Sequence, residues 1–181
     1  MPSLRTSPPS RSGASPVAGA QATPARRAPL YTPEQRARRD ASRWTLVQGL
    51  LAPFQFLVFA ISLGLVLRYL LTGEGLAAAT ASVVFKTVVL YTIMVTGAVW
   101  EKVVFGQWLF APAFYWEDVF SMLVLALHTA YLWALFTGAL DPRGLMGLAL
   151  AAYAAYLVNA AQFIWKLRMA RLDAARLEAA R

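Results

Sequence analysis

Residues 46–100 read LVQGLLAPFQFLVFAISLGLVLRYLLTGEGLAAATASVVFKTVVLYTIMVTGAVW. Two apolar runs, Leu46–Leu71 and Leu76–Trp100, are separated only by the turn-forming residues 72–75 (TGEG). Each run has the roughly 20 residues that a helix needs to cross about 30 Å of hydrocarbon. Because the connection is so short, we predict an antiparallel hairpin of two transmembrane helices.

The second half of the chain repeats this pattern. Apolar runs Val119–Leu140 and Leu145–Trp165 flank the turn residues 141–144 (DPRG). The composition agrees, since 59% of the chain is hydrophobic and 14% is charged, whereas soluble domains have about 25% charged residues. We predict an all-α polytopic membrane protein with four transmembrane helices arranged as two antiparallel hairpins.

Basic residues predict the orientation. Of the 17 Lys and Arg residues, only Arg68, Lys86, Lys102 and Arg143 lie between the start of the first span and the end of the last. The others flank the outer ends, so the positive-inside rule places both termini in the cytoplasm. The net charge of +8 is therefore typical of membrane topology and does not indicate nucleic acid. The absence of cysteine excludes disulfides, thiolate metal sites and cysteine nucleophiles.

The two ends of the chain differ from the apolar body. Residues 1–29 are rich in Pro, Ser, Ala and Arg, which favours a disordered tail over a transit peptide. We expect one membrane domain over residues 30–172 and a cytoplasmic tail over 173–181. Thr32 and Pro33 are good start signals for a short basic helix, Pro33–Trp44. This helix could lie against anionic lipid heads, or it could simply be a solvated charged helix.

The connector between the second and third spans is unusual. From Glu101 to Asp118 it includes a long uncharged aromatic stretch, and Gly106 and Pro112 argue against a regular fifth span. An interfacial or re-entrant segment fits this length and composition.

Polar residues inside the spans are the functional candidates. Helical spacing places Gln48, Gln55, Ser62 and Tyr69 on one stripe, and Glu117, Ser121 and His128 on another. Asn159, Gln162 and Lys166 form a third stripe. Most of these residues lie in the cytoplasmic half, so we expect a polar pocket that opens toward the cytoplasm.

Each candidate also has a structural interpretation. Glu117 and Asp118 can cap the third helix, and Glu101 can pair with its neighbour Lys102. His128 can be a packing residue, whereas Lys86 can snorkel or bind a carbonyl.

Motifs of soluble enzymes are absent from the sequence, including phosphate-binding glycine loops, HExxH and a nucleophilic serine elbow. The single histidine argues against a haem subunit with paired histidine ligands. A small transporter is a weaker alternative because the sequence has no inverted repeats.

Residues 97–122, GAVWEKVVFGQWLFAPAFYWEDVFSM, resemble the 3-vinyl bacteriochlorophyllide hydratase family. Further matching strings are LYTPEQRARRD (30–40), LYTIMVTG (90–97), LALHTAYL (125–132) and NAAQFIWKLRMARL (159–172). The resemblance implies that water adds to the 3-vinyl group of chlorophyllide a or 3-vinyl bacteriochlorophyllide a. It also implies a magnesium tetrapyrrole substrate, no redox cofactor, and a bacterial inner or intracytoplasmic photosynthetic membrane. Other bacteriochlorophyll-biosynthesis enzymes are potential partners, and a non-catalytic pigment carrier is the alternative function.

We assign catalytic roles to the candidate residues from their depth in the membrane, their helix face and the chemistry of the reaction. Glu117 or Glu101 would donate a proton to the vinyl group, and ionised Asp118 would stabilise the resulting cation. His128 would share the proton or act as an axial ligand to the pigment's magnesium; no metal is expected on the protein alone. The residues expected to bind substrate or water are Gln48, Gln55, Ser121, Asn159, Gln162, Trp100 and Trp116.

Overall fold

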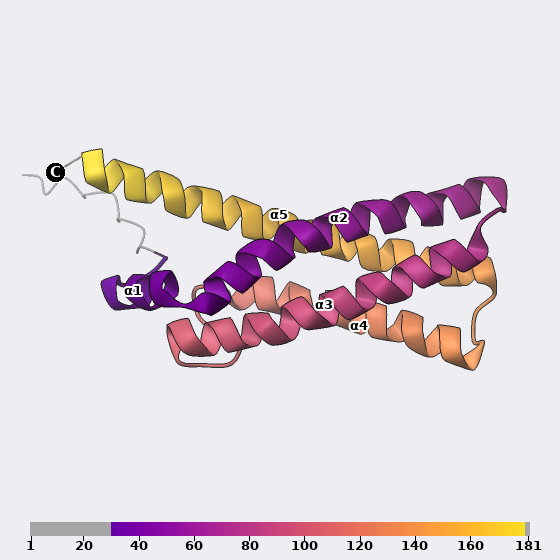
Figure 1. Ribbon diagram of the computed structural model, residues 1–181, viewed down its shortest axis with the longest axis horizontal. Coiled ribbons are helices and arrows are strands. Elements are labelled where there is room, and N and C mark those ends of the chain that lie inside the picture. Colours follow the sequence, from indigo (N-terminus) through magenta and orange to yellow (C-terminus); the bar gives the residue numbers. More distant parts are fainter. Residues whose placement is uncertain (1–29, 180–181) are drawn as a thin grey trace, which may run out of the picture.

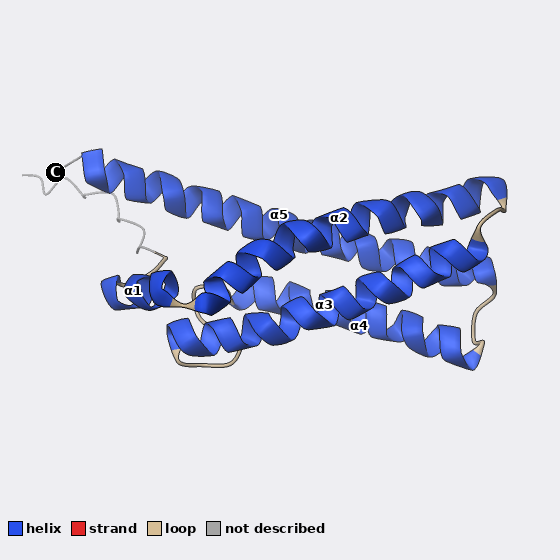
Figure 2. Cartoon of the chain, in the orientation of Figure 1, coloured by secondary structure: helices blue, strands red, loops and turns tan. Residues whose placement is uncertain are grey.

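The computed structural model describes residues 30–179, which form five α-helices and no strand (Figure 2). Four of these helices are long and apolar enough to cross a membrane, which confirms the predicted all-α class with four spans. The helices are α1 (Pro33–Ala41), α2 (Arg43–Thr72), α3 (Leu76–Phe105), α4 (Tyr115–Thr137) and α5 (Pro142–Ala179).

The four long helices form an elongated bundle (Figure 1). The main packing partners are α2 with α3 and α4 with α5, and α2 also crosses and contacts α5. Left-handed glycines end α2 and α4, with φ of 77° at Gly73 and 66° at Gly138. Glycine adopts this conformation without a steric penalty, so both helices can stop and the chain can reverse.

Polar ties join the helices inside the bundle. Ser62 on α2 hydrogen-bonds the Tyr153 hydroxyl on α5 at 2.6 Å and Ser82 on α3 at 2.7 Å. The outward faces stay apolar, as the exposed Leu71, Phe136 and Trp165 side chains illustrate. Interhelical hydrogen bonds inside an apolar exterior are typical of membrane bundles.

The short helix α1 has a complete N-terminal cap. Thr32 accepts a hydrogen bond from the Gln35 amide at 3.2 Å, and the Gln35 side chain accepts one from the Thr32 amide at 2.9 Å. The chain breaks at Ser42, so the predicted helix Pro33–Trp44 is divided between α1 and α2. Buried Tyr31 ties α1 to the bundle by stacking on Phe105. Burial raises the pKa of the Tyr31 hydroxyl, and nearby Arg39 opposes this to a smaller extent.

The long helices extend beyond the predicted spans at the end of the bundle near α1. α3 continues to Phe105 rather than ending at Trp100, because the first left-handed glycine after it is Gly106, with φ of 85°. α4 begins at Tyr115 rather than at Val119. The connector therefore shrinks to residues 106–114, and three acidic residues of the predicted connector become helical: Glu101 in α3, and Glu117 and Asp118 in α4. Similarly, α5 continues to Ala179 through most of the predicted tail 173–181, whereas the predicted tail 1–29 lies outside the described residues.

Candidate active site

Two carboxyl groups meet where α3 ends and α4 begins. Glu101 lies in the last turns of α3 and Asp118 in the first turn of α4, and their side chains are only 5% and 4% exposed. The two carboxyl groups are close enough to interact electrostatically. Because two adjacent buried anions repel each other, this arrangement favours a proton on one of the two residues. The pair can therefore hold and deliver one proton.

The connector covers this carboxyl pair with its backbone. The Phe110 amide donates to Asp118 Oδ2 at 2.8 Å, and the Ala111 amide donates to Glu101 Oε2 at 3.2 Å. Phe110 has φ of 59°, the only positive value among the described non-glycine residues. Such a conformation costs about 1–3 kcal/mol in a residue of this kind and persists only where the surroundings enforce it. The strained backbone at Phe110 thus belongs to the segment whose amides donate two hydrogen bonds to the carboxyl pair.

Glu117 faces a different partner. Its Oε2 lies 2.5 Å from the Lys166 ammonium nitrogen on α5, and that nitrogen also lies 5.1 Å from the centroid of the Phe114 ring. The ion pair with Lys166 offsets part of the cost of burying the Glu117 carboxylate. This geometry makes Glu117 a structural counter-ion for Lys166.

The Asn159 amide lies one turn deeper than the carboxyl pair. Asn159 on α5 donates its Nδ2 hydrogen to Ser121 Oγ on α4 at 2.8 Å. Its Oδ1, Gln162 Oε1 and Gln55 Oε1 are buried and have no hydrogen-bond partner among the described residues. Buried acceptors of this kind are costly, so a hydrogen-bond donor would be stabilised at each of these oxygens.

His128 lies away from the carboxyl pair, about two turns deeper on α4 than Ser121. Its Nε2 is 2.8 Å from Lys86 Nζ on α3, and its Nδ1 is 2.8 Å from the Val124 carbonyl oxygen. Lys86 Nζ also lies 4.3 Å from the centroid of the Tyr156 ring. Both ring nitrogens of His128 therefore have protein partners, and ligation of magnesium stays a prediction that would require the ring to leave Lys86.

The remaining predicted residues lie outside the carboxyl pair. Gln48 donates to the Thr96 hydroxyl at 2.7 Å, and the Trp100 indole donates to the Thr45 hydroxyl at 2.9 Å. Trp116 is 66% exposed and points outward. These three side chains do not join the carboxyl pair.

Sequence reasoning missed three features of the site. The hydrogen bonds from Phe110 and Ala111 are made by backbone amides, so the pattern of side chains does not predict them. The Lys86–His128 and Lys166–Glu117 pairs join different helices, so they depend on a helix packing that no local spacing encodes. The only signal was that all four residues are ionisable at membrane depth.

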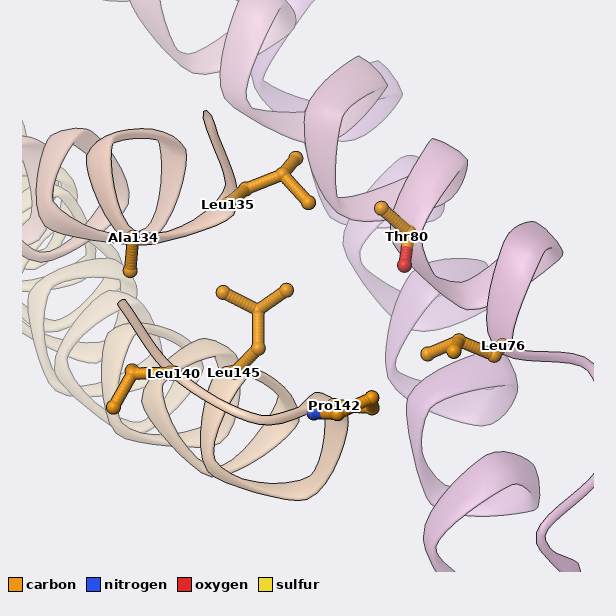
Figure 3. A pocket seen from close by; sticks show the side chains of 7 residues that line it. All are labelled: Leu76, Thr80, Ala134, Leu135, Leu140, Pro142 and Leu145. Atoms are coloured by element: carbon orange, nitrogen blue, oxygen red, sulfur yellow. The ribbon is translucent and has the colours of Figure 1, made fainter. Parts of the chain in front are cut away.

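The expected open pocket is closed in this structure, because the connector covers the carboxyl groups. A cavity of about 200 Å³ lies at the opposite end of the bundle, where Leu76 and Thr80 of α3 face Leu135 of α4 and Leu145 of α5 (Figure 3). A second, shallow groove follows the outer face of α3 along residues 88–96. Neither includes an acidic residue, and Glu101 and Asp118 stay buried beneath the connector.

These features define a helical integral membrane protein with a buried carboxyl pair inside one end of its bundle. Residues 31–169 match the model of the 2-vinyl bacteriochlorophyllide hydratase family, and the chain belongs to that family.

Two relatives carry the same description. The chain is 78% identical over 153 residues to a 2-vinyl bacteriochlorophyllide hydratase of Cereibacter sphaeroides, covering 84% of this chain and 93% of the relative. It is 70% identical over 152 residues to one of Rhodobacter capsulatus, covering 84% of this chain and 88% of the relative. No solved structure matches the chain.

Proposed function

We propose that this protein hydrates the vinyl group of a bacteriochlorophyllide precursor, converting it into a 1-hydroxyethyl group. Support comes from its family and from 78% identity to a relative described as a hydratase. The names of the relatives place the vinyl group at position 2 of the macrocycle, whereas the sequence resemblance placed it at position 3. The reaction class is the same. The observation that carries the mechanism is the buried pair of Glu101 and Asp118.

Hydration of a conjugated vinyl group needs an acid first and a nucleophile second. The π electrons of the vinyl group take a proton at the terminal carbon, and positive charge develops at the inner carbon and spreads into the macrocycle. Water then forms a C–O bond at the inner carbon and releases a proton to the carboxyl pair. One proton leaves the pair and one returns, so the reaction consumes only water and requires no redox cofactor.

Helix dipoles assign the two carboxyl groups different roles. Glu101 lies near the C-terminal end of α3, where the partial negative charge of the helix disfavours an anion. Asp118 lies in the first turn of α4, where the helix dipole favours an anion. Its hydrogen bond from the Phe110 amide, which is shorter than the one from the Ala111 amide to Glu101, acts in the same direction. Glu101 is therefore the proton donor, and ionised Asp118 stabilises the cation that follows. Glu117, the other predicted donor, is occupied by Lys166.

The setting suits a large, flat and mostly apolar magnesium macrocycle. We place residues 30–172 in a bacterial inner or intracytoplasmic photosynthetic membrane, with both termini and the connector on the cytoplasmic side. The pigment would reach the carboxyl pair from the bilayer when the connector moves away. Membrane lipid is then the medium of both protein and substrate, and other enzymes of the pathway would deliver the pigment and remove the product.

Matched variants of the two glutamates test the assignment. The full chain in detergent is mixed with chlorophyllide a, and mass spectrometry follows the gain of one water. Glu101→Gln cannot donate a proton and should lower turnover by about a hundredfold or more. Glu117→Gln loses only its ion pair and should keep turnover within about tenfold of the wild type.

Other outcomes would point elsewhere. Loss of turnover in Glu117→Gln but not in Glu101→Gln would move the donor role to Glu117. Unchanged pigment with the wild-type protein, despite tight binding, would support a carrier and overturn the hydratase.

A further inference from the structure

The nucleophile of this reaction needs a binding site of its own, and the buried amide oxygens supply one. We propose that Gln55 Oε1 and Asn159 Oδ1 hold the water molecule that adds to the vinyl group. The proposal rests on the hydratase function above, and assigns a site that is separate from the carboxyl pair.

Both amide oxygens are deeply buried and unpaired. Gln55 is 2% and Asn159 is 9% exposed, and neither side-chain oxygen accepts a hydrogen bond from the described residues. The orientation of Asn159 is set by its Nδ2, which donates to Ser121 Oγ at 2.8 Å and leaves Oδ1 facing the other way. Since both atoms are acceptors, the ligand that they stabilise must be a hydrogen-bond donor.

The two oxygens lie at one level of the bundle. Phe59 of α2 contacts Tyr156 of α5 with ring centroids 5.0 Å apart. Gln55 precedes Phe59 by four residues, and Asn159 follows Tyr156 by three. Because α2 and α5 run in opposite directions where they cross (Figure 1), one turn from this contact brings both residues to the same depth.

Asn159 lies close to the carboxyl pair. Ser121, which Asn159 contacts, follows Asp118 by one turn on α4, a rise of about 4.5 Å. The two carbon atoms of a vinyl group are directly bonded, so the acid and the water must act within a few ångströms of each other. A vinyl group between the carboxyl pair and the amide level meets that requirement.

Two acceptors suit a nucleophilic water for a chemical reason. A water that donates both hydrogens to amide oxygens keeps its lone pairs free for bond formation. The same oxygens direct the negative ends of their dipoles toward the developing cation and stabilise it. Neither amide competes as a base, so the released proton goes to the carboxyl pair.

Gln162 adds a third acceptor, on the same helix as Asn159, and we place the entry of water along this side of α5. It lies between Asn159 and Lys166 on one stripe of α5, and its buried Oε1 is the third unpaired acceptor. Lys166 is only partly buried. This stripe leads from the amide level to the polar end of the bundle.

Exchange in D₂O separates protonation from water addition. A variant that still protonates the vinyl group but cannot capture the cation should return it to the vinyl form with deuterium on the terminal carbon. We therefore expect Asn159→Leu with Gln55→Met to lower hydration by about a hundredfold while deuterium incorporation continues. Gln55→Glu keeps a carbonyl oxygen, so in an otherwise wild-type chain it should retain more hydration than Gln55→Met alone.

Controls make the outcomes distinct. Thr137→Val removes a hydroxyl that bonds only to the Trp133 carbonyl of its own helix, and should leave hydration and exchange unchanged. Unfolding temperature and pigment binding verify that each variant is folded. Equal loss of exchange and hydration in a folded double variant, or loss of neither, would overturn the water site. Loss of both activities in Glu101→Gln alone is required by the proposed function, and its absence would refute that function instead.

Discussion

Lys86 is the most deeply buried Lys, Arg, Asp or Glu side chain in the described bundle. It is fully buried, and its polar contact is an imidazole rather than a carboxylate. The sequence indicated that Lys86 would snorkel or bind a carbonyl, and neither occurs. The pair with His128 joins residues 42 positions apart, so only the packing of α3 on α4 could reveal it.

The Lys86–His128 pair predicts non-additive stability. His128→Leu leaves the Lys86 nitrogen buried without an acceptor, which should cost about 1–3 kcal/mol of unfolding free energy. Lys86→Met leaves His128 Nε2 without its partner and should cost a similar amount. The double variant removes both polar groups and should lose less than the sum, by about 1–2 kcal/mol. Unfolding in mixed micelles measures this double-mutant cycle.

The same variants decide the role of His128. If the histidine is a structural partner, the double variant should bind chlorophyllide a about as tightly as the wild type. Additive losses of stability, together with weakened pigment binding in both variants that lack His128, would support axial ligation of the pigment's magnesium instead.

At the scale of elements, the connector between α3 and α4 covers the carboxyl pair with two backbone amides. Its length and aromatic content predicted a segment at the membrane interface, and that placement stays a prediction. The sequence could not reveal its hydrogen bonds, because Phe110 and Ala111 act through backbone amides. By contrast, Gly106 was a readable stop signal, and its left-handed conformation ends α3.

Substitutions at Phe110 separate its backbone from its ring. Phe110→Gly should keep hydratase turnover, since glycine adopts φ of 59° with no steric cost. Phe110→Val should lower turnover about tenfold or more, because a β-branched residue resists positive φ and would withdraw the amide from Asp118. Phe110→Ala should fall between the two. If glycine lowers turnover as much as valine does, the ring rather than the backbone is what the site requires.

At the scale of the whole molecule, the lengths of the apolar runs and the positions of the charged residues predicted most of the fold. Runs of apolar residues identified four spans, and these correspond to α2 to α5. They did not locate the helix ends near the carboxyl groups, because the apolar runs end before Glu101 and begin after Asp118. In the structure α3 continues past Glu101 to Phe105, and α4 begins at Tyr115, where the helix dipole suits the acidic residues of the first turn.

The charge pattern also predicts which ends of the bundle face the cytoplasm, and the absence of cysteine makes this directly measurable. Single cysteines are introduced at the exposed positions Glu74, in the α2–α3 turn, and Arg38, in α1. A membrane-impermeant thiol reagent should label Glu74→Cys in intact cells whose outer membrane is permeable. It should label Arg38→Cys only after the inner membrane is opened, because the basic end stays on the cytoplasmic side. Asp141→Cys, in the α4–α5 turn, should behave like Glu74→Cys, since an even number of crossings separates the two turns. Labelling of Arg38→Cys in intact cells would invert the bundle and place the carboxyl pair at the opposite membrane surface from the one proposed.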